Sequence, residues 1–487
     1  MSSRSALHSG LAIAFGVAAQ YLFFRQLTGL NTLIALGLFL ALVGFARRPG
    51  VAPRRLDLWM PAAALALAAA CAIRTDQALL VLNVVATVLL GCGTVISFSG
   101  VAVGSLPIAD VFAQAVAVGH GATAGAAATI GSAWSRVGPR PARRLARVAP
   151  YVRGVVLAMP LVVVFAGLFS SADAIFARSL TEVFDLRRWR EALADLPART
   201  AIAMFAAWVA IGAVAMLGRA RRPAAPRMPW ALLDIEPATV MLVTIDLLFL
   251  GFVGLQIAYL FGGRDTMDAA AITYSSYARR GFFELIAVAI MVAALLFALD
   301  LSVRKRGRAY VAAALSLLAL TTVVLVSAGY RLDLYQRAYG WSEQRLYAFA
   351  VIACLAAAIA ILAWSIATDR TAVAFSRMAA AATAVALLLN LLAPSAYIAR
   401  ANLDRSIDPS SLPEDAERAL DSSYLVSLGD GAIPVIIDRL PQLPDRERAH
   451  LERLLARERF RRDLFHAPDW RGWNLDRELA REALAFR

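Results

Sequence analysis

The chain has 487 residues, of which 60% are hydrophobic and 17% are charged, and its net charge is +14. Soluble domains are about half apolar and about a quarter charged. This composition excludes an ordinary soluble domain, a disordered tail and a disulfide scaffold. An excess of positive charge also occurs in nucleic-acid-binding proteins, but in a chain this apolar it is explained first by membrane orientation. We therefore expect a lipid bilayer and no nucleic acid as partner.

Long apolar runs follow one another along most of the chain. A helix needs about 20 apolar residues to cross a bilayer. The sequence therefore predicts an all-α fold, a polytopic integral membrane helix bundle of about 11 transmembrane helices. The first run leads directly into the second, so we interpret it as an uncleaved helix and not as a signal peptide. The runs cover approximately residues 8–24, 29–46, 57–73, 78–99, 151–170, 200–218, 238–261, 282–300, 309–329, 347–367 and 376–394.

Basic clusters follow the second, fourth, sixth and eighth runs. Cytoplasmic loops of membrane proteins are enriched in Arg and Lys, so these loops and the N-terminus are predicted to lie inside. An odd number of spans then places the C-terminal tail outside. Lys305 is the single lysine, which is typical of the codon bias of a GC-rich bacterial genome. The clusters are Arg47, Arg48, Arg54 and Arg55; Arg136, Arg140, Arg143, Arg144 and Arg147; Arg219, Arg221, Arg222 and Arg227; and Arg304, Lys305, Arg306 and Arg308.

One further segment, residues 111–131, is apolar enough to be a marginal extra span. If it crossed, every later loop would change sides. The regular alternation of the Arg clusters favours a helix lying on the inner face instead.

The composition divides the chain into three parts. Residues 1–149 hold about four spans with basic cytoplasmic loops and the inner-face segment, and residues 150–395 hold about seven spans. Residues 396–487 form a polar tail, in which 15 Arg balance 17 Asp and Glu when counted from residue 395. The tail is predicted to be a small helical module with a helix start at Ser411, a helix over 445–464 and a last helix after Trp470 and Trp473. Leucine stripes on these helices indicate a core of the module's own.

Aromatic, arginine and acidic side chains gather in three segments of the predicted outer face, residues 169–178, 274–284 and 330–341, the last of which we expect to be an outer loop. One interpretation is a shared cleft, in which Arg binds an anionic headgroup or glycan phosphate and the acids serve as acid–base groups or cation ligands. The other is an aromatic belt with interfacial ion pairs, which bilayer interfaces collect in any case. The candidates are Asp173, Arg178, Tyr277, Arg279, Arg280, Glu284, Arg331, Asp333 and Arg337.

Asp246 lies well inside the seventh apolar run, with Gln256 toward the outer end of the same run. A carboxylate at this depth costs several kcal/mol unless it is paired or faces water. We expect it to face the bundle interior, either in a transport or proton-relay path or in a packing hydrogen bond.

The sequence indicates no cofactor and no metal. Cys71, Cys92 and Cys354 lie in separate apolar runs, and the four histidines have no ligand spacing. Nucleotide-binding and hydrolase motifs are absent as well.

Four segments together resemble a known family: FSSADAIFARSL from residue 169, YSSYARRGFFEL from 274, YRLDLYQRAYGWSEQRLYAF from 330, and LDSSYLVSLGDGAIPVI from 420. Their order is similar to that in bacterial multi-pass membrane proteins catalogued as domain of unknown function 4173, which is grouped with 4153. The resemblance implies a bacterial inner-membrane protein with a polar C-terminal segment. It implies no activity and no catalytic residues.

These observations favour a non-enzymatic membrane protein, either transporter-like or a scaffold of the envelope that binds a protein partner through its tail. One alternative is a membrane enzyme acting on a lipid-linked or anionic substrate at the extracytoplasmic face. A second alternative is a membrane sensor or regulator with an extracytoplasmic tail. The sequence leaves the substrate and the oligomeric state open.

Overall fold

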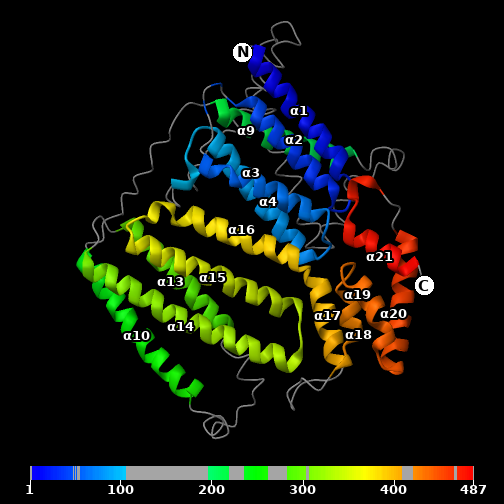
Figure 1. Cartoon of the computed structure of the whole chain (residues 1–487). Coiled ribbons are helices and arrows are strands. Elements are labelled where there is room, and N and C mark those ends of the chain that lie inside the picture. The colour runs from blue at the N-terminus through cyan, green and yellow to red at the C-terminus, as the bar shows by residue number, and fades with distance from the viewer. Residues whose placement is uncertain are drawn as a thin grey trace, which may run out of the picture.

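A computed structural model of the chain describes residues 3–47, 49, 51, 55–105, 196–218, 235–261, 282–302, 307–408, 420–465 and 469–485. Every element in these ranges is a helix (Figure 1). The α-helices are α1 (Ser3–Phe23), α2 (Leu30–Ala46), α3 (Trp59–Cys71), α4 (Gln77–Phe98), α9 (Leu196–Gly218), α10 (Ile235–Phe261), α13 (Phe282–Ser302), α14 (Arg308–Tyr339), α15 (Glu343–Ala367), α16 (Ala374–Leu392), α17 (Pro394–Ile407), α18 (Ser422–Ser427), α19 (Ile433–Arg439), α20 (Asp445–Phe465) and α21 (Leu475–Ala485). Short 3₁₀ turns are η1 (Arg55–Asp57), η2 (Val103–Ser105), η3 (Thr371–Val373), η5 (Leu440–Gln442) and η6 (Trp470–Gly472).

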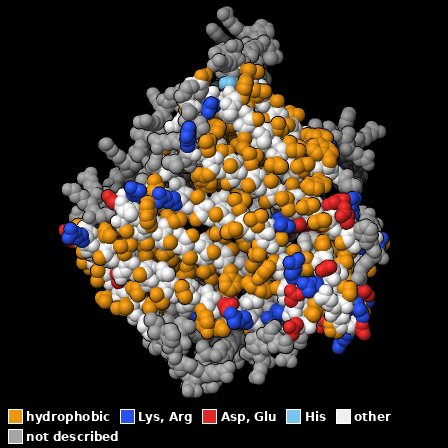
Figure 2. All heavy atoms as spheres, viewed as in Figure 1, with side chains coloured by type: hydrophobic (Ala, Val, Ile, Leu, Met, Phe, Trp, Pro, Cys, Tyr) orange, Lys and Arg blue, Asp and Glu red, His pale blue; other side chains and the backbone are white. Residues whose placement is uncertain are grey.

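Ten of the eleven predicted spans coincide with described helices, from α1 to α4, α9, α10 and α13 to α16. The remaining predicted span, 151–170, and the marginal segment 111–131 lie outside the described residues. Six of the described helices are long and apolar enough to cross a membrane, and four shorter helices are apolar too. Large hydrophobic side chains cover the visible face of the bundle, whereas charged side chains gather over the tail (Figure 2). The fold is therefore the predicted all-α membrane bundle.

The bundle has two halves joined by one helix. In the first half, α2, α3, α4 and α9 enclose a core around Val43 and Leu67, both fully buried. In the second half, α10, α13, α14 and α15 enclose a core around Leu242 and Leu317. α16 belongs to both, because its Ala386 is buried in the first core while its Met378 packs against the second (Figure 1).

Small residues bring α1 and α9 together. A Cβ added at Gly16 would lie 2.7 Å from the Ala207 Cβ and would also collide with the Ala203 carbonyl. Such close approach is how membrane helices gain packing energy where the surrounding lipid is as apolar as their own side chains.

The connections between helices lie alternately at two opposite ends of the bundle. The α1–α2, α3–α4 and α14–α15 turns lie at the end that carries the tail, while η1, η2 and η3 contact one another at the other end. α9 begins at the tail end, where the Arg199 guanidinium lies 4.4 Å from the Phe24 ring centroid. α4 and α9 consequently run in the same direction.

One sequence expectation was wrong. Residues 330–341 were treated as an outer loop, but α14 continues without a break to Tyr339. Side chains one turn apart support these polar turns, since Asp333 pairs with Arg337 at 2.8 Å and Tyr335 stacks on Tyr339 at 4.9 Å. The helix ends at Gly340, whose φ of +78° is a left-handed value that favours glycine.

The tail is a helical module with its own core. The predicted helix over 445–464 is α20, and the predicted last helix is α21. Leu451, Leu455 and Leu484 are buried together with α17, α18 and α19, which confirms that the leucine stripes serve mainly as core. Leu475 and Leu479 on α21 instead stay exposed. The predicted helix start at Ser411 lies outside the described residues.

The opposite placement of tail and inner turns predicts a labelling pattern. We expect Ala456→Cys, exposed on α20, to react with a membrane-impermeant maleimide in spheroplasts of a bacterial host. Thr368→Cys, exposed at the other end of the bundle, should react only after permeabilisation. Both are made in a chain whose three native cysteines are replaced by Ala. The reverse pattern would invert the orientation derived from the Arg clusters.

Candidate functional site at the junction of spans and tail

The C-terminal end of α3 is completed by the tail. Asn474 Nδ2 donates to the Cys71 and Arg74 carbonyls, both at 2.9 Å. The backbone N–H groups of Leu475 and Asp476 donate to the carbonyls of residues 72 and 73, at 2.9 and 3.0 Å. The last carbonyls of a helix have no partners within the helix. Here the first residues of α21 supply those partners, and the negative end of the α3 dipole meets the positive end of α21.

A second contact joins the tail to the α1–α2 turn. The Leu30 N–H donates to the Trp473 carbonyl at 3.0 Å, and a Cβ on Gly29 would lie 2.9 Å from the Gly472 carbonyl carbon. Gln26 Nε2 donates to Asp469 Oδ2 at 2.9 Å, and Arg471 Nε donates to the same carboxylate at 3.0 Å. These bonds hold the pKa of Asp469 at about 2, chiefly through Arg471.

Buried charges lie between these contacts and the bundle. Arg74 donates to the Asn390 carbonyl from Nε at 2.8 Å and pairs with Asp476 at 3.1 Å. Burial raises the pKa of Asp476 to about 6, and the nearby Asp76 adds to this, while Arg74 opposes it. The site therefore holds a carboxyl group that titrates near neutral pH.

Asp76 is buried beside Ser395 at the start of α17. The Ser395 hydroxyl lies within hydrogen-bond distance of Asp76 Oδ1 and also 2.9 Å from the Leu428 carbonyl. Burial raises the pKa of Asp76, whereas the hydrogen bond from the Ser395 hydroxyl and the nearby Arg74 oppose that shift.

Deeper in the bundle, Asn83 on α4 and Asn390 on α16 exchange two amide hydrogen bonds of 2.8 Å each. Both side chains are buried. Each amide satisfies the other where neither water nor lipid supplies a partner, which fixes α16 against the first half.

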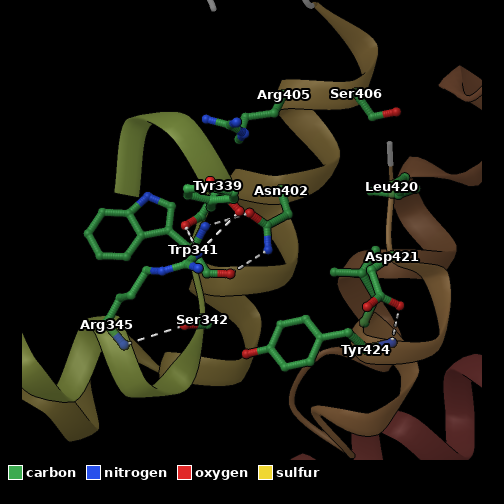
Figure 3. Close-up of a pocket in the computed structure, with 12 residues that line it drawn as sticks. Tyr339, Trp341, Ser342, Arg345, Asn402, Arg405, Ser406, Leu420, Asp421 and Tyr424 are labelled. Carbon is green, nitrogen blue, oxygen red and sulfur yellow. Dashed lines mark hydrogen bonds between the residues drawn. The ribbon is translucent and has the colours of Figure 1, made fainter. Parts of the chain in front are cut away.

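A pocket of about 220 Å³ opens beside this junction, between the α14–α15 turn, α17 and α18 (Figure 3). Asn402 fixes the turn by accepting from the Trp341 N–H and donating to its carbonyl, both at 2.8 Å. Tyr424 accepts from the Glu343 N–H at 2.9 Å and so connects α18 to α15. The pocket walls are thus held by bonds that cross between spans and tail.

Two arginines in the pocket wall complete the end of α14. Arg345 donates to the carbonyls of Tyr339 and Gly340, at 3.1 and 2.6 Å, and Arg405 donates to those of Arg337 and Ala338, at 2.8 and 3.3 Å. The Arg345 guanidinium also lies 4.3 Å from the Tyr335 ring centroid. Its Nε is buried and has no acceptor among the described residues.

The structure brings together only part of the predicted outer cleft. Asp333 and Arg337 form a partly exposed ion pair on α14, and Arg331, two residues before Asp333 on the same helix, has a buried Nε. Glu284 lies on α13, but its side chain is outside the described residues. Asp173, Arg178, Tyr277, Arg279 and Arg280 are outside them too, so the cleft stays a prediction.

Asp246 is half-buried between α10 and α14, where Ser316 of α14 interacts with its carboxylate. Its Oδ1 is buried and has no hydrogen-bond partner among the described residues. Gln256 lies two to three turns later on α10, with its side chain outside the described residues.

Sequence reasoning missed the groups that converge at the junction. Arg74 and Asp76 are isolated charges in a short turn, Asn83 and Asn390 are single amides in apolar runs, and Asn474 is an ordinary tail residue. The signal that was available is that a polar residue within or beside a span needs a partner. It does not say which partner.

Comparison with known families gives one match. The profile of a domain of unknown function, DUF4153, matches residues 62–439. Since this is more than half of the chain, the protein belongs to that family, whose function is unassigned. No curated protein and no solved structure matches the chain.

Because the folded pKa of Asp476 lies near 6 and its ordinary value is about 3.9, the docked tail binds a proton more tightly than the undocked tail. Docking should therefore be strongest below about pH 4 and weaken as the pH rises to about 6, by at most about 3 kcal/mol. Burial raises the pKa of Asp76 as well, so Asp76 acts in the same direction.

Hydrogen exchange of α21 in lipid nanodiscs, corrected for intrinsic pH dependence, measures this opening. Asp476→Asn should give slow exchange at pH 7.5 and a smaller pH slope. If the pH slope of exchange were the same in Asp476→Asn as in the wild type, a group other than Asp476 would cause the pH dependence of docking.

Proposed function

We propose that this protein is a non-enzymatic scaffold of the bacterial cell envelope, embedded in the cytoplasmic membrane with its N-terminus inside and its tail outside. The observation that carries the proposal is the docking of the tail. It bonds to the α1–α2 and α3–α4 turns of the first half and packs on Leu346 and Trp341 of the second half. A tail held this firmly is suited to presenting a surface in a fixed orientation.

An exposed apolar surface on the docked tail supports the proposal that the tail binds a protein partner. Trp470, Trp473, Leu475 and Leu479 are each more than a third exposed, although the tail is otherwise strongly charged. Exposed apolar groups clustered within polar surroundings are typical of interaction sites. We also propose that the chain is related to the family 4173 and that it is bacterial.

A disruption of docking tests the scaffold role. Asn474→Ala leaves two carbonyls at the end of α3 without donors, which costs about 2–4 kcal/mol for two buried groups. A photo-crosslinking residue at position 479 should yield a protein adduct of defined mass in cells, and the Asn474→Ala substitution should abolish it. Gln442→Ala removes an exposed amide from the same tail and serves as the matched control. Adducts with lipid alone, or an adduct indifferent to Asn474→Ala, would contradict the scaffold role.

A second candidate, a transport path, is favoured by Asp246 alone. Its buried Oδ1, which has no hydrogen-bond partner within the described part of the chain, is the kind of group that intramembrane ion or proton sites contain. If the protein transports, Asp246→Asn should abolish pH-dependent uptake or efflux in proteoliposomes, whereas Thr244→Val, at an exposed position of the same helix, should leave it unchanged. Equal fluxes in wild type and Asp246→Asn would remove the reason for this candidate. The enzyme and sensor alternatives gain no specific support from the described residues.

A further inference from the structure

The pocket between the α14–α15 turn, α17 and α18 lies at the depth of lipid headgroups. α14 has 32 residues and is therefore about 48 Å long, whereas the hydrocarbon core is about 30 Å thick. Its apolar part ends near Gly329, and the following turns carry Tyr, Arg and Asp. The Tyr339 end of α14, which forms one pocket wall, therefore projects into the headgroup region.

Positive charge lines one side of this pocket. Arg345 and Arg405 reach it from α15 and α17, and both are anchored by carbonyls of α14, so their positions are fixed before any ligand arrives. A guanidinium has five N–H donors and suits the oxygens of a phosphate. Capping of α14 accounts for the bonds to carbonyls, but it leaves the buried Nε of Arg345 without an acceptor among the described residues.

Negative charge lies on the opposite side. Asp421 begins α18 and accepts from the Tyr424 N–H with Oδ1 at 2.8 Å, and its exposed carboxylate borders the pocket. Figure 3 shows Asp421 across the pocket from the side chain of Arg405. A ligand that is only anionic would meet repulsion here, whereas one with a positive group a few bonds from a phosphate would match both sides.

We propose that this pocket binds a phosphoethanolamine group, with the phosphate at Arg345 and Arg405 and the amine at Asp421. The volume of about 220 Å³ is below the range of drug-sized sites and fits a group of this size. The same chemistry occurs in ethanolamine phospholipids and in free phosphoethanolamine. The proposal is independent of the scaffold role, since the apolar face of α21 does not line the pocket.

Microscale thermophoresis of the purified full chain in detergent tests the assignment. The titrants are dihexanoyl phosphatidylethanolamine, dihexanoyl phosphatidylglycerol, free phosphoethanolamine and inorganic phosphate. We expect saturable binding of the ethanolamine compounds, at least tenfold tighter than that of the glycerol lipid or of phosphate. Preference for the lipid over free phosphoethanolamine assigns a membrane ligand, and equal affinity assigns a soluble one.

Three variants locate the binding. Arg405→Gln should weaken binding at least tenfold, whereas Arg337→Gln, which removes an exposed arginine that does not line the pocket, should leave it unchanged. Asp421→Asn retains a side-chain oxygen for the helix cap and should abolish the preference for ethanolamine over glycerol. Arg405→Lys keeps the charge and is used if Arg405→Gln fails to fold, with helical content as the check.

Absence of saturable binding would overturn the proposal. Binding that is equally strong in the Arg405 variants would do the same, and so would an ethanolamine preference that survives Asp421→Asn.

Discussion

The backbone carbonyls at the end of α3 impose the constraint on which the junction depends. A helix that ends at a membrane surface leaves its last carbonyls unpaired unless water or protein supplies donors. In this chain the donors come from Asn474 and the first N–H groups of α21, about 400 residues later in the sequence. The tail is therefore part of the bundle's hydrogen bonding, and its removal would take these donors away from the end of α3.

The same solution is repeated at α14. Its terminal carbonyls are satisfied by Arg345 and Arg405, one from the next span and one from the helix that opens the tail. Because arginine carries more donors than one helix end uses, such a cap also creates a fixed positive surface. The same two arginines therefore stabilise the end of α14 and line the pocket beside it. A variant separates the two roles only if it keeps the hydrogen bonds to the helix end while it changes the pocket, or the reverse.

Buried charge gives the junction its sensitivity to protons. Asp76 and Asp476 share one close cation, Arg74, within surroundings that disfavour ionisation. A buried pair of this kind contributes little net stability but makes docking depend on protonation. The dry amide pair of Asn83 and Asn390 lies next to it and does not titrate, so it holds α16 in place whatever the state of the tail.

The sequence by itself determined the class of the protein and the course of its spans. Ten predicted apolar runs became helices, because the length of a hydrophobic stretch is set by the bilayer and needs no knowledge of neighbours. The parallel directions of α4 and α9 also agree with the predicted alternation. Two of the tail helices, α20 and α21, followed from their leucine periodicity.

Only the tertiary structure decided which polar residues meet. Arg74 is separated by more than 300 residues from Asn390 and by about 400 from Asp476, and each alone reads as a turn, a buried amide or a surface acid. Residues 330–339 were mistaken for a loop because hydropathy marks where a helix leaves the lipid and not where its hydrogen bonding ends. The physical reason is the same in both cases: burial patterns are local in sequence, whereas the satisfaction of polar groups depends on segments brought together by packing.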